Sequence, residues 1–154
     1  MHPPVRIDRG AIAALIPHQG AMCLLDAIEA WSADEITARS TTHRMQSNPL
    51  REHDGLPATA AIEYAAQAIA VHGGLLAREQ GGRARPGYLV AVRDVRISVG
   101  YLDRVDADLE VRATRVVANA TGLMYTFIVA AADQTLVSGR ATVTLETPLE
   151  GVSR

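Results

Sequence analysis

The sequence predicts a single α+β domain in which a curved antiparallel sheet of about six strands wraps around one long central helix. Two observations predict this fold class. Residues 57–77 are rich in alanine and apolar on nearly every side, as in a buried helix. The segments before and after them alternate apolar and polar residues, as strands do. Because no second helix of comparable length is predicted, the sheet must cover this one.

The composition fits one domain over residues 1–154 and excludes several classes of protein. Apolar residues make up 48% of the chain, which is enough for a proper core. The formal charge of -2 predicts neither a nucleic-acid-binding surface nor a polybasic membrane anchor. No segment is long enough to span a bilayer, and the N-terminal apolar segment is too short for a signal peptide. The single cysteine, Cys23, cannot form a disulfide within the chain, so we expect a cytoplasmic protein.

The residues before the central helix predict a short helix and two strands. Asp8 can cap a helix that Pro17 ends, because the residue before a proline avoids the helical region. The apolar run that follows, and the alternation from Glu35 onward, predict a hairpin. The expected elements are a helix at 8–16, a turn at 16–20, strands at 22–31 and 35–43, and a loop at 44–54.

The central helix is expected over about residues 57–77, beginning at Pro57, and the Gly73-Gly74 pair marks either a break or a close approach. Glu63 is a carboxylate in its apolar first half, where burying a charge is costly unless the group is used. Residues three and four apart share a face of a helix. One face therefore carries Glu63, Ala66, Gln67, Ala70 and Gly74. This face either lines a narrow cavity with an acid at its mouth or lets another helix approach closely.

The residues after the helix predict a polar connection at 78–87 and then a meander of strands. The expected strands are 89–99, 109–117, 123–132 and 136–146, followed by a frayed tail at 147–154. A sheet of this kind leaves an edge strand with unpaired backbone groups. Pairing the edges of two subunits is the simplest way to cover it, so we expect a dimer or a higher oligomer.

Several motifs resemble the hot-dog-fold 3-hydroxyacyl-acyl-carrier-protein dehydratases. Residues 16–26, IPHQGAMCLLD, resemble the opening I-P-H-R-x-P-x-L-L-V-D of that family, and residues 62–68, IEYAAQA, resemble its helix motif I-E-x-x-A-Q. With Asn48-Pro49-Leu50 and the later strands, the resemblance covers about residues 10–146. The sequence is most similar to the divergent dehydratase subunit of aryl polyene biosynthesis clusters, with its N-P-L, I-E-Y and H-G-G-L motifs. The resemblance implies a hot-dog fold.

The resemblance also implies an activity: dehydration of 3-hydroxyacyl thioesters held on acyl carrier protein, in fatty acid or aryl polyene biosynthesis. This reaction needs a base for the C2 proton, an acid for the departing hydroxyl and donors for the thioester carbonyl. The family motifs imply Glu63 as the acid and backbone N–H groups near Ala58 and Thr59 as the donors. Gln67 shares the face of Glu63 and is expected beside the substrate. No cofactor is implied, and the five histidines lack metal-ligand spacing, so we predict no metal.

The identity of the catalytic histidine stays open. In the family it lies further before the glutamate, in a G-H-F-P-G turn, whereas His53 is only ten residues before Glu63. His53 matches by its distance after Pro49, and His43, at the end of the preceding strand, is the alternative. His72 is expected to pack near the helix end and help its last carbonyls, and His18 is expected to fix a turn.

Two other functions also stay open. A helix carboxylate that works with water would make a hot-dog acyl thioesterase. A chain that supplies Glu63 but no histidine would be a half-site or non-catalytic partner subunit, which the shortened histidine turn supports. The expected assembly is therefore a homodimer or a heterodimer with another hot-dog subunit. We expect some of the following arginines to receive an acidic carrier protein: Arg78, Arg83, Arg85, Arg93 and Arg96.

Overall fold

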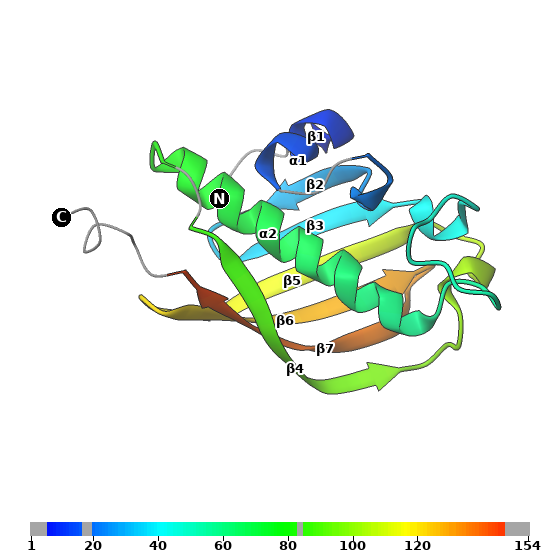
Figure 1. Ribbon diagram of the computed structural model, residues 1–154. Coiled ribbons are helices and arrows are strands. Elements are labelled where there is room, and N and C mark those ends of the chain that lie inside the picture. The colour runs from blue at the N-terminus through cyan, green and yellow to red at the C-terminus, as the bar shows by residue number, and fades with distance from the viewer. Residues whose placement is uncertain (1–5, 17–19, 83–84, 147–154) are drawn as a thin grey trace.

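The computed structural model describes residues 6–16, 20–82 and 85–146, and it shows a seven-stranded sheet curved around one long helix (Figure 1). The strands are β1 (Ile7–Asp8), β2 (Ala27–Trp31), β3 (Glu35–Ser40), β4 (Gly87–Ile97), β5 (Leu109–Ala118), β6 (Gly122–Ala131) and β7 (Gln134–Leu145). The α-helices are α1 (Arg9–Leu15) and α2 (Ala61–Glu79). Short 3₁₀ helices are η1 (Gly20–Met22), η2 (Thr42–Arg44), η3 (Ala58–Ala60) and η4 (Leu102–Arg104).

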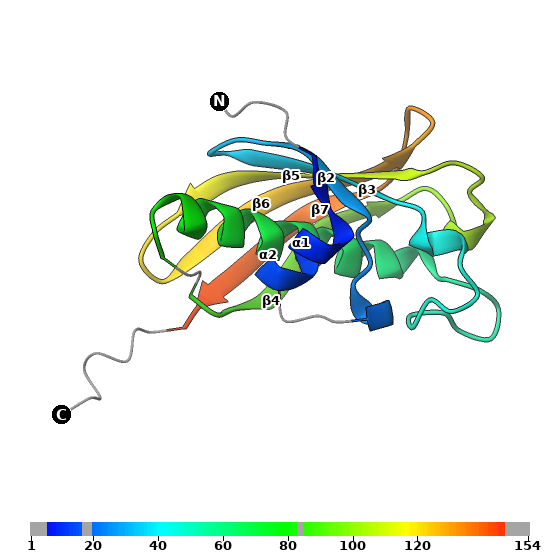
Figure 2. The same ribbon diagram turned by 90° about the horizontal axis from the view of Figure 1, so that it is seen from above.

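The sheet and the central helix form the predicted hot-dog arrangement. The strand order is β1-β2-β3-β5-β6-β7-β4, and every neighbouring pair is antiparallel. α2 crosses the concave face of the sheet, with α1 beside it (Figures 1 and 2). The core lies between them, where Tyr64 and Ala68 of α2 are buried with inward residues of the strands such as Val111 and Phe127. In the part of the chain that is described, no helix is long and apolar enough to cross a membrane.

The sheet differs from the expectation at its N-terminal edge. It has a seventh strand, because β1 pairs with the start of β2 through Ile7 and Ile28. Only residues 27–31 of the strand expected at 22–31 join the sheet. The preceding backbone bonds instead to the Gln67 side chain of α2, after the 3₁₀ turn η1. Residues 17–19 with His18, Arg83 and the tail at 147–154 lie outside the described residues.

The small-residue face of α2 lets α1 come close. Asp8 caps α1 by accepting a hydrogen bond from the Ala11 N–H at 3.0 Å. α1 then packs on α2 at Gly74, where a Cβ atom would lie only 3.2–3.3 Å from Leu15 atoms. A close helix contact is one of the two roles expected for this face of α2. The contact with α1 lies at Gly74, toward the C-terminal end of the face.

β4 is an edge strand with apolar side chains on the surface. Tyr88 is 59% exposed, Val90 58% and Ile97 48%, and no other strand of the described chain pairs with this side of β4. Monomeric proteins generally protect the edge strands of their sheets, because the unpaired backbone groups of such a strand can pair with another chain. The edge therefore has the character of a surface that another subunit covers.

Candidate active site

The start of α2 is fixed by the segment that precedes β5. The Leu56 N–H donates to the Asp103 carboxylate at 2.9 Å, and the Ala58 N–H donates to the Gly100 carbonyl at 3.0 Å. Burial alone would raise the pKa of Asp103, but the hydrogen bond from Leu56 lowers it below its ordinary value. These bonds hold the entry to α2 and thereby position Glu63 in its first turn.

Glu63 lies one helical turn before an apolar groove. Its side chain is half-buried, and Ala66 and Ala70 follow it on the same face of the helix. The groove begins beside Ala66, one turn after Glu63, and it is the second role expected for this face. The N-terminal end of a helix also favours negative charge. A carboxyl group therefore lies in the first turn of α2, one turn before the groove.

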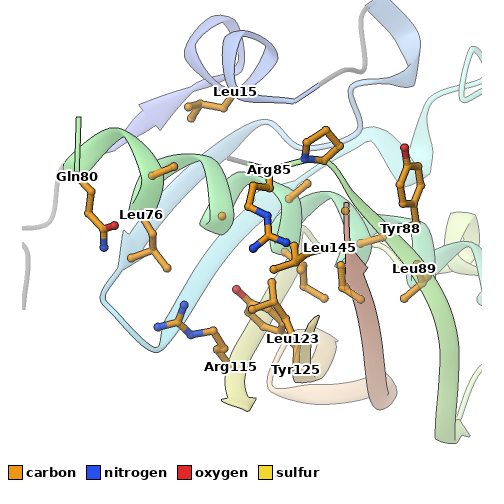
Figure 3. A pocket seen from close by; sticks show the side chains of 18 residues that line it. Leu15, Leu76, Gln80, Arg85, Tyr88, Leu89, Arg115, Leu123, Tyr125 and Leu145 are labelled. Carbon is orange, nitrogen blue, oxygen red and sulfur yellow. The ribbon is translucent and has the colours of Figure 1, made fainter. Parts of the chain in front are cut away.

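The groove has the shape and lining for an extended apolar chain. Its volume is about 790 Å³, and it runs along α2 between the helix and the inner face of the sheet (Figure 3). From Ala66 to Ala77 the helix rises by about 17 Å. The wall opposite the helix is largely aliphatic and aromatic: Tyr88, Leu89, Leu123, Tyr125, Val143 and Leu145. Because Tyr88 and Leu89 belong to β4, the groove opens beside the exposed edge.

The two expected carbonyl donors differ in the structure. The Ala58 N–H is engaged by the Gly100 carbonyl, so this amide already has a partner. Thr59 is exposed at the start of the helical segment. Of the two, Thr59 is the one that remains a proposed donor to the substrate.

Gln67 is completely committed to the protein backbone. Its Oε1 accepts a hydrogen bond from the Leu24 N–H at 2.9 Å, and its Nε2 donates to the Met22 carbonyl at 2.7 Å. The side chain is 1% exposed. These contacts favour a tether between α2 and residues 22–24 over the expected contact with substrate.

Two motif residues meet in one buried network. The Tyr64 hydroxyl lies 2.7 Å from the Thr42 hydroxyl and accepts a hydrogen bond from Asn48 Nδ2 at 2.9 Å. The Asn48 side-chain oxygen in turn accepts from the Leu50 N–H at 2.9 Å. The N-P-L and I-E-Y motifs therefore act together, because they fix the loop before α2 against the residue that follows Glu63.

Neither expected histidine is joined to Glu63 by a hydrogen bond. His53 is exposed in the turn between Glu52 and Gly55. His43 is fully buried, its Nε2 lies 3.1 Å from the Val105 carbonyl, and its Nδ1 has no partner. Burial lowers the pKa of His43 below its ordinary value. These contacts favour a packing role for His43.

His72 is a packed histidine, as expected, but its partners are not the helix carbonyls. Its Nε2–H donates to the Ser32 carbonyl at 2.8 Å, and its Nδ1 accepts from the Tyr125 hydroxyl at 2.6 Å. The Ser32 carbonyl can only accept, so Nε2 carries a proton, and in the neutral imidazole that burial favours, Nδ1 is the acceptor. Burial lowers the pKa of His72 and raises the pKa of Tyr125 to about 12. The pair ties α2 to β6 and to the β2–β3 turn.

We expect the protein to lose stability as the pH falls below about 6.5, the ordinary pKa of histidine. His43 and His72 have lowered pKa values when folded, so the unfolded chain takes up protons first and stability falls with pH. Each contributes a slope of at most about 1.4 kcal/mol per pH unit. Denaturant unfolding between pH 7.5 and 5.5, about one unit either side of that pKa, measures this slope. His53→Ala, which changes an exposed histidine, should keep it, and a flat profile would contradict the prediction.

Arg115 lines the groove and was not among the expected site residues. The signal was present in the alternation of β5, whose inward residues Leu109, Val111 and Ala113 are buried. Continuing the alternation by one step puts a charged residue on the inner face of the sheet, where apolar residues are the rule. A charge at such a position makes Arg115 a candidate for a role in the groove.

A family model shows the family of this chain, and the solved structures share its fold. The sequence matches the ApeP-like family, described as ApeP dehydratase, over residues 10–151. No curated protein sequence matches it. The dehydratase heterocomplex ApeI:P from Xenorhabdus doucetiae is a similar solved structure, with a TM-score of 0.80 and 24% identity, covering 92% of this chain and 94% of that chain.

Thioesterases of known structure share the fold at greater distance. HI1161 from Haemophilus influenzae has a TM-score of 0.57 and 14% identity over 80% of this chain and 79% of its own. A mutant of PA1618 from Pseudomonas aeruginosa has a TM-score of 0.62 and 13% identity over 90% of this chain and 93% of its own. The family match, by contrast, spans the helix with Glu63 and all the strands from β2 to β7. The chain therefore belongs to the ApeP-like dehydratase family, and its enzyme class is that of a dehydratase, a lyase.

Proposed function

We propose that the protein removes water from 3-hydroxyacyl thioesters carried on acyl carrier protein, giving trans-2-enoyl thioesters for aryl polyene or fatty acid biosynthesis. One observation carries the proposal: an apolar groove runs along α2 from Ala66, one helical turn after Glu63. The acyl chain would occupy the groove, with its first carbons beside the carboxyl group. Membership of a dehydratase family supports this reaction over thioester hydrolysis.

In the proposed reaction a histidine takes the C2 proton and Glu63, as the carboxylic acid, gives a proton to the C3 hydroxyl. The C3–O bond breaks, a double bond forms between C2 and C3, and water leaves. The Thr59 N–H is the proposed donor to the thioester carbonyl, where it would stabilise the charge that develops on oxygen. Gln67 serves as a positioning residue, since its amide is bonded to the backbone. No cofactor is needed for this elimination.

We further propose that a second hot-dog subunit completes the site. Within one chain, His43 is buried and bonded elsewhere, and His53 is exposed in a turn. The groove opens beside the apolar β4 edge, so a subunit paired there would close it and bring its own residues to Glu63. The similar ApeI:P structure is a dehydratase heterocomplex, which supports a heteromeric partner. A homodimer that uses His53 is the alternative arrangement.

The proposal is tested by incubating a 3-hydroxyacyl carrier-protein substrate with the purified chain, alone and with a co-expressed hot-dog dehydratase subunit. Loss of the mass of one water is the expected result, and activity only with the partner identifies a shared site. Release of free thiol without an enoyl product would make the protein a thioesterase. The same assay with a pantetheine thioester tests the carrier: carrier-bound substrate should react faster, and salt should weaken that advantage.

The β4 edge gives a separate prediction about assembly. Val90→Lys should prevent the chain from forming its dimer or heteromeric complex, because it places a charge on the apolar edge. Ile128→Lys is the matched control, since Ile128 is an exposed apolar residue of β6, which is an interior strand of the sheet. Size-exclusion chromatography with light scattering measures both. Assembly that survives Val90→Lys unchanged would contradict the β4 interface.

The compartment that we propose is the cytoplasm. The sequence has one cysteine, Cys23, and it is buried. A chain without a disulfide of its own suits a reducing compartment.

A further inference from the structure

We propose that Arg115 is a specificity-determining residue that binds an oxygen-bearing group at the far end of the acyl chain. The inference rests on the proposed function, since it takes the groove to hold that chain. A guanidinium is a planar set of hydrogen-bond donors that suits a hydroxyl or carboxylate oxygen. A chain that ends in a methyl group offers it no partner.

Arg115 is at the correct end of the groove for this role. It follows the buried inward residues Val111 and Ala113 of β5 and lies opposite Tyr125 of β6 in the sheet register. Figure 3 shows its side chain on the sheet side of the groove, at the end where Leu76 and Gln80 of α2 lie. Glu63 lies at the other end of α2, so a chain that reacts at Glu63 would extend toward Arg115.

The guanidinium of Arg115 is free to take a ligand. The other arginine of the groove, Arg85, is engaged: it donates to the Glu146 carbonyl at 2.8 Å and to the Ala120 carbonyl at 3.0 Å. Within the described chain, the Arg115 side chain makes no ion pair with a carboxylate and no hydrogen bond, while its backbone N–H donates to the Asp34 carbonyl at 2.6 Å. A half-buried charge without a partner is costly, and a ligand oxygen would compensate it.

The Tyr125 side chain next to Arg115 is fixed by hydrogen bonds. The Tyr125 hydroxyl is hydrogen-bonded to His72, and His72 is hydrogen-bonded to the Ser32 carbonyl. These two bonds hold the Tyr125 ring, which lies beside Arg115 in the sheet register. Besides burial, the positive charge of Arg115 lowers the pKa of His72, consistent with a guanidinium close to this pair. A cation beside this fixed aromatic ring can discriminate between chain ends, because an oxygen accepts hydrogen bonds from the guanidinium and a methyl group cannot.

The test measures binding of saturated acyl-pantetheine thioesters, which lack the C3 hydroxyl and cannot be dehydrated. Three probes of equal chain length end in a methyl, a hydroxyl or a carboxylate group. The protein is used as its assembled complex. We expect the oxygen-ended probes to bind about tenfold to hundredfold more tightly than the methyl-ended probe, as for hydrogen bonds to a charged group. Arg115→Met should abolish the preference, and Arg115→Lys should restore part of it.

Arg112→Met is the matched control, because Arg112 is an exposed arginine of the same strand that points to the outer face. It should leave the preference unchanged. Equal binding of all three probes by the wild type, or an unchanged preference in Arg115→Met, would overturn the inference. Either result leaves the proposed function standing, since dehydration is measured separately and with a reactive substrate.

Discussion

Replacing Glu63 by Gln is expected to lower the dehydration rate of the assembled enzyme by about 10²–10⁴-fold, the usual contribution of a positioned proton-transfer group. Gln matches the shape of Glu but cannot give a proton to the departing hydroxyl. The residue is half-buried in the first turn of α2, so the fold should survive the change. The measurement is the turnover number at saturating 3-hydroxyacyl carrier-protein substrate. Mass spectrometry monitors the reaction through the loss of one water from the substrate.

The matched control for this substitution is Glu79→Gln in the last turn of the same helix. Glu79 is exposed and lies at the opposite end of the helix from Glu63, so this variant should keep the wild-type rate. Thermal unfolding of both variants separates a catalytic loss from a folding loss. If Glu63→Gln turned over substrate at nearly the wild-type rate, Glu63 would not be the acid.

The main architecture could be predicted because its signals are local. An alanine-rich apolar segment around Glu63 can only be a buried helix, and the alternation in residues 109–117 and 136–146 can only bury one face. These patterns predicted the sheet and the position of Glu63 in the first half of the helix, where it lies in the first turn. The strand predicted at 22–31 was too long, because only residues 27–31 join the sheet. The backbone of residues 22–24 bonds instead to the Gln67 side chain, a tertiary contact that periodicity cannot reveal.

The histidines show why the rest of the site could not be predicted. His43 and His53 both fit by sequence position, yet one is enclosed beside Val105 and the other is exposed in a turn. Nothing local distinguishes them, because burial depends on what η4 places against η2. If the catalytic base comes from a second subunit, as we propose, the sequence of this chain alone does not contain it. The apolar edge at β4 is the feature of this chain that points to such a partner.

Gln67 gives the clearest separation between a tether and a substrate contact. Gln67→Ala should lower the free energy of unfolding by about 2–4 kcal/mol, because it leaves the buried Leu24 N–H and the Met22 carbonyl without partners. Gln67→Glu should lose at least as much, since it buries a carboxylate that still accepts from Leu24 but faces the Met22 carbonyl oxygen without a proton to donate. Urea unfolding at neutral pH measures both variants.

The control for Gln67 is Gln80→Ala, which removes an exposed amide after the end of α2 and should leave stability unchanged. The two roles of Gln67 predict opposite results. A tether gives variants that unfold more easily while the KM of the remaining folded enzyme changes little. A substrate contact gives variants of wild-type stability with a raised KM, and that result would restore the contact that the helix face first suggested. Because the Gln67 amide already makes both of its bonds within the protein, we expect the first result.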